Sequence, residues 1–200
     1  MAGANFKIEN LDALGRARDR VVALRDGGSK VIMRAIGTLK RRLPTWMKRD
    51  IGQSFALPQN KIGKRLRVKA DSNSLTLTAL GRYQTLVNFP VRKTATGLRA
   101  QIRTSGAVEI PHAFLRVPAK VPGIGPQAFI RDAAARDLPA DVYDIASVER
   151  TQHGYPIRLL GGPSVAMMMT EGDRIDRATD YAGDLFAQEV DRLVEVESGK

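Results

Sequence analysis

The chain of 200 residues contains no cysteine, two histidines and a single tryptophan. Without cysteine, disulfides, thiolate metal sites and thiol nucleophiles are all excluded. The histidines, His112 and His153, are far apart in sequence and belong to no HExxH motif. Gly123-x-Gly125 lacks a third glycine, and no GxxxxGK[ST] sequence occurs, so nucleotide binding is not supported. We therefore expect no metal, no cofactor and no enzymatic activity.

Long hydrophobic runs are also lacking. The most apolar stretch, 157–169, is interrupted by Arg158 and Pro163 and is too short to span a bilayer. No apolar run follows the first charged residue, as a secretory signal would require. We expect a soluble protein that is assembled in the cytoplasm and has no membrane partner.

Basic residues are abundant, but they are unevenly distributed. Lysine and arginine number 32 against 21 acidic residues, a net charge of +11. Residues 1–104 hold 22 basic and 6 acidic side chains, net +16, whereas residues 105–200 hold 10 basic and 15 acidic ones, net −5. Such a basic half fits a polyanion or an acidic protein surface, and the acidic half argues against uniform wrapping by nucleic acid.

Helical periodicity marks both ends of the chain. Aliphatic residues from Ile8 to Leu24 predict an amphipathic helix ended by Gly27-Gly28. Ser29 is the expected N-cap of a second helix, which Pro44 kinks or restarts and which continues to about residue 55. Helical turns are predicted after Pro58 and after Pro163-Ser164, and a long amphipathic helix from Asp173 to about Glu197.

The middle of the chain alternates charged and aliphatic residues instead. Arg65–Ala70 and Leu75–Thr78 predict a hairpin around the turn-forming residues 71–74. Further predicted strands are Thr85–Phe89, Leu98–Thr104, Ala107–Ile110, Ala128–Arg131 and Ile145–Arg150. We predict an α+β fold with N-terminal helices, a central antiparallel or mixed β-sheet and a long C-terminal amphipathic helix. It forms one domain, 1–200, with a helical N-terminal region (1–57), a β-rich core (65–162) and a helical C-terminal region (163–200).

Two charged segments are candidates for chemistry. The segment from Lys40 to Lys69 contains ten basic residues and one acidic residue. This density of positive charge suits the binding of phosphates or of an acidic partner. Trp46 and Phe55 could stack on bases, but their helical spacing favours a core role. The residues predicted to contact the polyanion or acidic partner are Lys40, Arg41, Arg42, Lys48, Arg49, Lys61, Lys64 and Arg65.

The other charged segment is acidic. Its four carboxylates could suggest a metal-dependent nuclease, because hard cations prefer oxygen ligands. Arg131 and Arg136 lie among them, however, and the spacing fits no calcium loop. We interpret the segment as a solvated acidic loop, formed by Asp132, Asp137, Asp141 and Asp144.

Several short motifs resemble a known family. These are Ile110-Pro111-His112-Ala113-Phe114-Leu115, Ala128-Phe129-Ile130, Tyr155-Pro156-Ile157-Arg158 and Pro163-Ser164-Val165-Ala166, followed by one long helix. Together with the helices and the basic segment before them, they resemble the minor tail protein Z family of tailed bacteriophages and prophages. The chain departs from the family in its acidic final helix and its Pro/Gly-rich loop, 118–126.

The resemblance implies a structural role in the virion and no active site. It implies a tail-completion or minor tail protein at the head-proximal end of the tail, forming a ring, expected to be a hexamer, at the head–tail junction. Its partners would be other copies of itself and tail terminator, tail tube or neck proteins, with packaged DNA left open. The structural motif would consist of Ile110, Pro111, Phe114, Phe129, Tyr155, Pro156 and Ile157, with the phenylalanines as buried anchors.

Physical arguments make such a role reasonable but leave an alternative. Opposite charges in the two halves suit repeated heterologous contacts between copies that close into a ring. The alternative is a small nucleic-acid-binding protein that uses the basic segment 40–69. The sequence does not decide between phage, prophage and gene-transfer particle origins.

Overall fold

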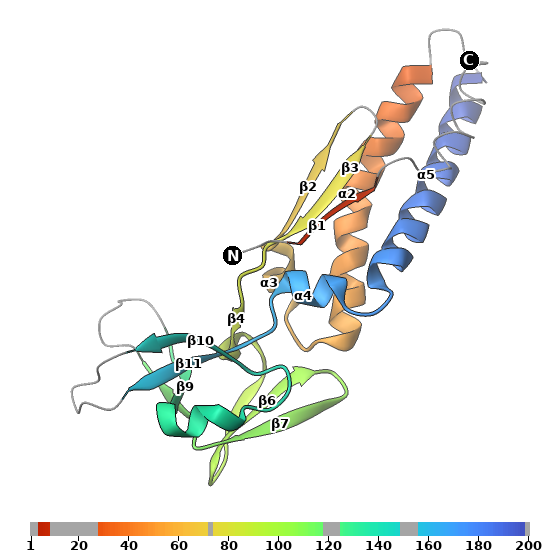
Figure 1. Ribbon diagram of the computed structural model, residues 1–200. Coiled ribbons are helices and arrows are strands. Elements are labelled where there is room, and N and C mark those ends of the chain that lie inside the picture. Colours follow the sequence, from red (N-terminus) through yellow and green to blue (C-terminus); the bar gives the residue numbers. More distant parts are fainter. Residues whose placement is uncertain (1–3, 9–27, 72–73, 118–124, 149–155, 199–200) are drawn as a thin grey trace.

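The protein is described by a computed structural model for residues 4–8, 28–71, 74–117, 125–148 and 156–198. It is built from two lobes (Figure 1). The helical lobe contains 4–8, 28–80 and 164–198, and the β lobe contains 84–162, always within the described ranges. The chain therefore leaves the helical lobe after residue 80 and returns to it just before the last two helices.

Two long antiparallel helices and a small sheet form the helical lobe. Helix α2 lies between helix α5 and the sheet, whose strand order is β1-β3-β2 with antiparallel pairing (Figure 1). Two short helices lie at its base, next to the β lobe. The elements are β1 (Ala4–Ile8), α2 (Gly28–Ser54), α3 (Gln59–Gly63), β2 (Leu66–Ala70), β3 (Leu75–Ala79), α4 (Val165–Thr170) and α5 (Arg174–Ser198).

The β lobe consists of short antiparallel strands in two sheets. One has the order β5-β6-β7; the other has the order β10-β11-β9-β8, with β4 also paired to β11. Two 3-10 helices complete it, η1 (Leu86–Asn88) and η2 (Asp132–Asp137). The strands are β4 (Gln84–Thr85), β5 (Val91–Lys93), β6 (Gly97–Arg103), β7 (Gly106–Pro111), β8 (Phe114–Arg116), β9 (Gln127–Arg131), β10 (Tyr143–Val148) and β11 (Ile157–Gly162).

This architecture confirms the α+β prediction, including the hairpin of β2 and β3, the strands β6, β7 and β9, and the C-terminal helix. Helix α2 runs through Pro44 without a break, because its packing compensates for the missing N–H. Its buried apolar side chains recur every four positions, and since four residues turn by 400° the buried stripe winds around the helix. They are Val31, Ala35, Leu39, Leu43, Met47 and Ile51, and the buried Phe55 continues this spacing just beyond the end of the helix.

Two secondary-structure predictions are wrong. The helix predicted from Ile8 does not begin there, because Ile8 is the last residue of strand β1, which pairs with β3; the rest of that predicted helix lies outside the described residues. Thr85–Phe89 is not a strand but mostly the turn η1. Leu86 and Phe89 are both buried, and a three-residue spacing places them on the same side only in a helical turn.

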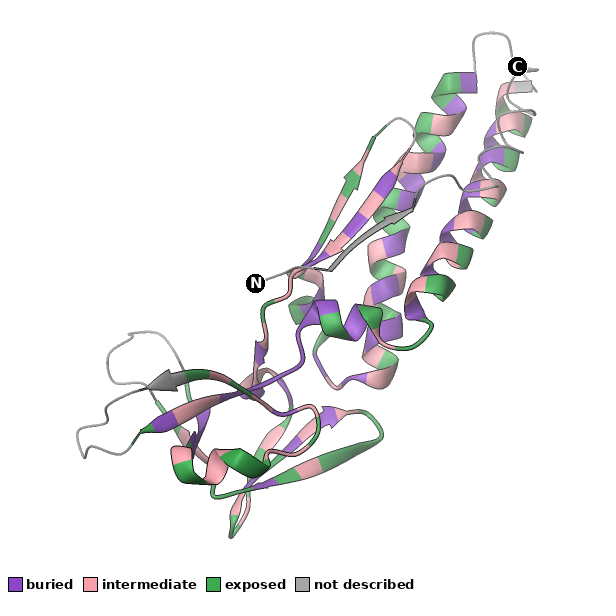
Figure 2. Ribbon diagram, in the orientation of Figure 1, coloured by how far each residue is buried: buried purple, intermediate pink, exposed green. Residues whose placement is uncertain are grey.

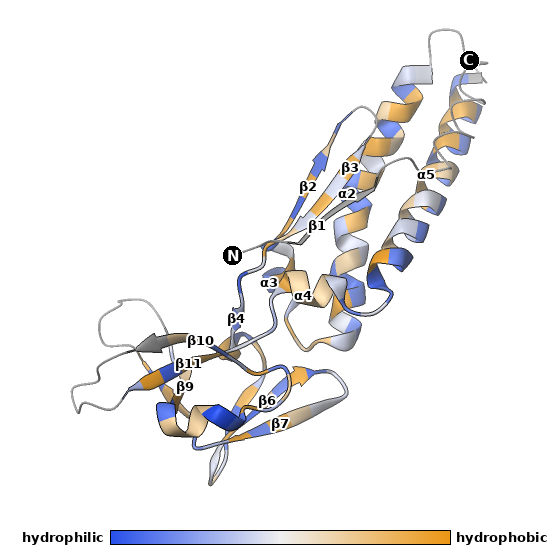
Figure 3. Ribbon diagram, viewed as in Figure 1, coloured by the Kyte–Doolittle hydropathy of each residue, from blue (hydrophilic) through white to orange (hydrophobic). Residues whose placement is uncertain are grey.

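Buried positions lie along α2, α5 and β11, and one cluster of buried apolar side chains extends through both lobes (Figure 2). Both long helices alternate hydrophobic and hydrophilic residues along their length (Figure 3). In the described ranges of the chain, none of the helices combines the length and the apolar character needed to cross a membrane.

Candidate functional site

The predicted basic residues do not form one patch. Lys40, Arg41 and Arg42 are consecutive in α2 and therefore diverge by about 100° from one residue to the next. Arg42 faces the neighbouring helix: together with Arg192, whose hydrogen bonds have the larger effect, it lowers the pKa of Glu189 on α5. The side chain of Lys48 instead lies against Gly63, at the end of α3.

The rest of the predicted set lies farther along the chain. Arg49 is exposed on the last turns of α2, Lys61 is exposed on α3, and Lys64 is exposed immediately after it. Arg65 is half-buried and directly precedes β2. A backbone hydrogen bond of 3.0 Å from Leu80 N to Arg65 O continues the β2–β3 ladder by one residue, so Arg65 extends the strand.

A basic face is formed on the outer side of the small sheet. Strand β2 buries Leu66 against α2 and exposes Arg67 and Lys69, because alternate residues of a strand point to opposite sides. Thr78 and Thr76 of β3 are paired with these two basic residues, so the adjacent strand supplies hydroxyls and no carboxylate. We define the basic face as Arg65, Arg67 and Lys69; none of the three makes an ion pair with a described residue.

An acidic stripe runs along the exposed side of α5. Asp176, Asp180 and Asp184 follow one another at four-residue intervals and share one face of the helix. All three are exposed, and none makes an ion pair with a described residue. Like charges at this spacing destabilise a helix by about 0.2–0.5 kcal/mol per pair. The stripe therefore opposes folding of the isolated chain.

The basic face and the acidic stripe lie on opposite sides of the helical lobe. Figure 1 shows the sheet on one side of α2 and α5 on the other, and the exposed stripe of α5 faces away from α2. Figure 3 shows the corresponding hydrophilic positions on β2 and along α5. The tertiary structure thus converts the charge difference between the two halves of the sequence into two separate outer surfaces.

A buried ion-pair network fixes α5 against α2. Asp50, 8% exposed, accepts hydrogen bonds from Arg174 Nε at 2.6 Å and from Arg177 Nη2 at 2.8 Å. Arg174, whose side chain is 5% exposed, also donates to Ser54 Oγ at 2.9 Å and to the Met168 carbonyl. These bonds set the register of the helices and so the position of the acidic stripe.

The two lobes meet around Phe55. This residue is 2% exposed and pairs with Arg103 of β6 through an isolated antiparallel bridge. The guanidinium of Arg103 lies 4.4 Å from the centre of the Phe55 ring, within cation–π range. Arg103 also binds Asp141 at 2.7 Å within the β lobe and Glu171 of the helical lobe, and these hydrogen bonds raise its pKa. The Phe55–Arg103 contact therefore holds the two lobes together.

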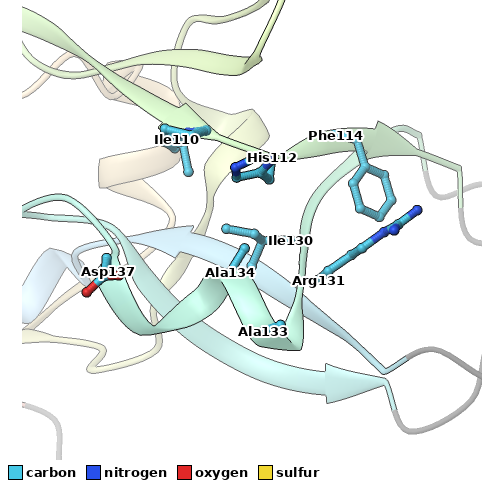
Figure 4. Close-up of a pocket in the computed structure, with 9 residues that line it drawn as sticks. Ile110, His112, Phe114, Ile130, Arg131, Ala133, Ala134 and Asp137 are labelled. Carbon is cyan, nitrogen blue, oxygen red and sulfur yellow. The ribbon is translucent and has the colours of Figure 1, made fainter.

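An open groove of about 850 Å³ lies in the β lobe (Figure 4). Figure 4 shows His112 and Asp137 on different walls of it. The ionisable side chains among the groove's lining residues are those of His112, Arg131 and Asp137, and the other lining residues are apolar. The lining residues are Ile110, Pro111, His112, Phe114, Ile130, Arg131, Ala133, Ala134 and Asp137.

The motif residues of the resemblance are divided between this groove and the core. Ile110 is buried, Pro111 is exposed, and His112 adopts a positive φ of 62° in the turn between β7 and β8. Phe129 is buried and stacks on Phe114, with the ring centres 6.2 Å apart, but Phe114 itself is only half-buried. Pro156 is exposed and Ile157 is buried in β11, whereas Tyr155 lies outside the described residues.

Most of the acidic segment 132–144 is bound to arginines. Arg158 of β11 binds both Asp132 and Asp144, and Arg103 binds Asp141. Asp137 is exposed beside the groove. Within the described ranges, no group of three histidine, aspartate or glutamate residues lies close enough to hold a metal ion. The segment is therefore largely a set of ion pairs inside the β lobe.

The fold is thus α+β, with a charged helical lobe and a β lobe inserted into it. No family model matches the chain, and neither a curated protein nor a solved structure matches it. The functional argument therefore rests on the surfaces of the molecule itself.

Proposed function

We propose that this protein is a structural component of a bacteriophage or phage-like particle, a tail-completion or minor tail protein that forms a ring at the head-proximal end of the tail. The observation that carries the proposal is the opposite charge of the two outer sides of the helical lobe, on Arg67 and Lys69 of β2 and on Asp176, Asp180 and Asp184 of α5. A subunit with two different complementary surfaces assembles by heterologous contacts, and these close into rings when the rotation between copies permits.

The other surfaces support a structural role. The groove of the β lobe brings together apolar side chains with the imidazole of His112, the guanidinium of Arg131 and the carboxylate of Asp137, and the imidazole and the carboxylate lie on separate walls. The ion pairs around Phe55 hold the lobes together as a scaffold would require. In this proposal the partners are other copies of the chain and tail terminator, tail tube or neck proteins, and the protein is located in the virion.

The experiment is to locate the chain in particles. Particles from a producing host that carries a tagged copy of the gene are purified and imaged by electron microscopy with label against the tag. We expect label at the head–tail junction, and unjoined heads and tails when the gene is deleted. Particles that are complete and infectious without the chain would refute the proposal.

A second candidate function is nucleic-acid binding through the segment 40–69. The basic face of β2 favours it, because Arg67 and Lys69 are exposed beside threonine hydroxyls and carry no acidic partner among the described residues. This function predicts an affinity for duplex or single-stranded nucleic acid that falls steeply with salt. Fluorescence anisotropy with a labelled oligonucleotide at low and high salt tests it.

A further inference from the structure

We infer that the basic face of one copy binds the acidic stripe of the next, so that Arg65, Arg67 and Lys69 of β2 lie along Asp176, Asp180 and Asp184 of α5 in a head-to-tail contact. This inference rests on the proposed function, since it assigns the surfaces through which the ring would form. It commits to a second copy of this chain as the occupant of both surfaces.

The first argument is geometric. Residues four apart in a helix are separated by about 6 Å along the axis, and residues two apart in a strand by about 6.8 Å. Three carboxylates of α5 and three cationic groups at β2 therefore follow one another at nearly the same interval. A strand laid along the helix can match each acid with one base.

The second argument is electrostatic. None of these six side chains makes an ion pair with a described residue of its own chain. The neighbouring Asp173 differs, because Arg177 already binds it. The available charges of the three residues of the basic face are thus all positive, and those of the three residues of the acidic stripe are all negative. Contact with a second copy would remove the repulsion along α5 and along β2 together.

The third argument is topological. Both surfaces belong to the helical lobe and lie on its opposite sides, with α2 between them (Figure 1). A copy that docks through one surface therefore leaves the other free for the next copy. Such a heterologous contact repeats, and it closes into a ring or continues as a filament according to the angle between copies.

The test uses two charge-reversed forms of the full chain. One carries Asp176→Lys, Asp180→Lys and Asp184→Lys, and the other Arg65→Glu, Arg67→Glu and Lys69→Glu. A control matched to the second form carries the same change of charge on exposed residues of the β lobe, Arg92→Glu, Lys93→Glu and Arg116→Glu. Circular dichroism and thermal unfolding confirm that each form is folded, and sedimentation velocity at low and high salt measures self-association.

We expect the wild type and the control to associate at low salt and to dissociate at high salt. Each reversed form alone should lose self-association by at least about 100-fold, because losing three attractive pairs of about fivefold each already gives this factor and the new repulsion adds to it. In a mixture of the two reversed forms, the native basic face of one meets the native acidic stripe of the other, and the two reversed surfaces are also complementary. The mixture should associate again.

Three results would overturn the inference. They are a wild type that remains monomeric at all concentrations and salts, reversed forms that associate like the control, and a mixture that stays dissociated. If the β2 reversal abolishes oligonucleotide binding while the α5 reversal leaves self-association intact, the basic face serves nucleic acid instead. Particles that contain the chain while these reversals leave assembly unchanged would refute this contact and leave the proposed function standing.

Discussion

The two lobes use their charges in different ways. In the β lobe, Asp132, Asp141 and Asp144 each bind an arginine of the same lobe. In the helical lobe, one carboxylate, Asp50, is buried with Arg174, while the acidic stripe and the Arg67 and Lys69 side chains of the basic face remain exposed on opposite sides. The comparison teaches that charge satisfied within a lobe fixes its shape, whereas charge left unpaired at its surface is available to another molecule.

The largest expected effect is the loss of stability when the buried carboxylate of the helical lobe is removed. Asp50→Ala leaves the guanidinium of Arg174 buried without a carboxylate. We expect the free energy of unfolding to fall by about 3–5 kcal/mol, the usual cost of removing one partner of a buried ion pair. Urea denaturation measures it. The matched control is Asp173→Ala, because Asp173 is exposed and binds only the exposed Arg177; equal losses in the two variants would contradict the role given to Asp50.

In the β lobe, we expect a substitution that disturbs close backbone packing to lower the stability. A Cβ atom at Gly97 of β6 would lie 2.2 Å from the carbonyl oxygen of Ile110 on β7. Gly97→Ala should therefore displace β7 and lower the free energy of unfolding by about 1–3 kcal/mol. Thermal unfolding monitors the loss. Gly106→Ala is the control, since no atom lies within 4 Å of its added Cβ; a similar loss there would show that the contact at Gly97 is not the cause.

A substitution at the junction between the lobes should lower the free energy of unfolding by less. Arg103→Ala removes the ion pairs to Asp141 and Glu171 and the contact with Phe55. Because the Arg103 side chain is 35% exposed, we expect a loss of about 1 kcal/mol. Amide hydrogen exchange should accelerate at Ala56 and Thr104, which donate the hydrogen bonds between the lobes.

Arg99→Ala serves as the control for the junction, because Arg99 is exposed on the same strand, β6. It should leave the exchange of Ala56 and Thr104 unchanged. If both variants accelerate this exchange equally, Arg103 has no particular role in joining the lobes.

The smallest expected effect is a pH dependence of the helical lobe. Hydrogen bonds from Arg192, and secondarily from Thr38, hold the pKa of Glu189 below its ordinary value. The contribution of Glu189 to the free energy of unfolding is therefore complete above the ordinary glutamate pKa of about 4.3. It is lost as the pH falls through the lower pKa of Glu189 in the folded state. Glu189→Gln should reduce this acid-induced loss by about 0.5 kcal/mol in urea titrations between neutral and acidic pH.

The control for the pH prediction is Asp184→Asn, because Asp184 makes no ion pair with a described residue. This variant should keep the acid-induced loss attributed to Glu189. An unchanged pH profile in Glu189→Gln would show that its hydrogen bonds do not stabilise the folded state.

The elements with a clear period could be predicted from sequence. The alternation of charged and aliphatic residues predicted the β2–β3 hairpin, and the helical spacing of apolar residues predicted α2 and α5. The predicted core role is confirmed for Phe55, which is 2% exposed, whereas Trp46 is half-buried and stacks on Tyr181 of α5. Strand β1 was missed because a five-residue segment becomes a strand only through its pairing with β3.

The surfaces were predicted only incompletely. The sequence indicated a basic segment and an acidic last helix, but it did not separate Arg67 and Lys69, which point outward together, from Lys40, Arg41 and Arg42, which diverge around α2. Alternation along β2 was the signal that could have selected them. Nothing local indicates that Arg103 binds both Asp141 and Glu171, because these partners are distant in sequence.

The sequence by itself determined the α+β class, the two long amphipathic helices and the difference in charge between the halves, because periodicity and composition are local properties. Only the tertiary structure decided where those charges lie. Helix α2 packs between the sheet and α5, so the basic face and the acidic stripe become opposite outer sides of one lobe, while Asp50 is buried between helices more than a hundred residues apart. Such an arrangement follows from long-range packing, which no short pattern of residues specifies.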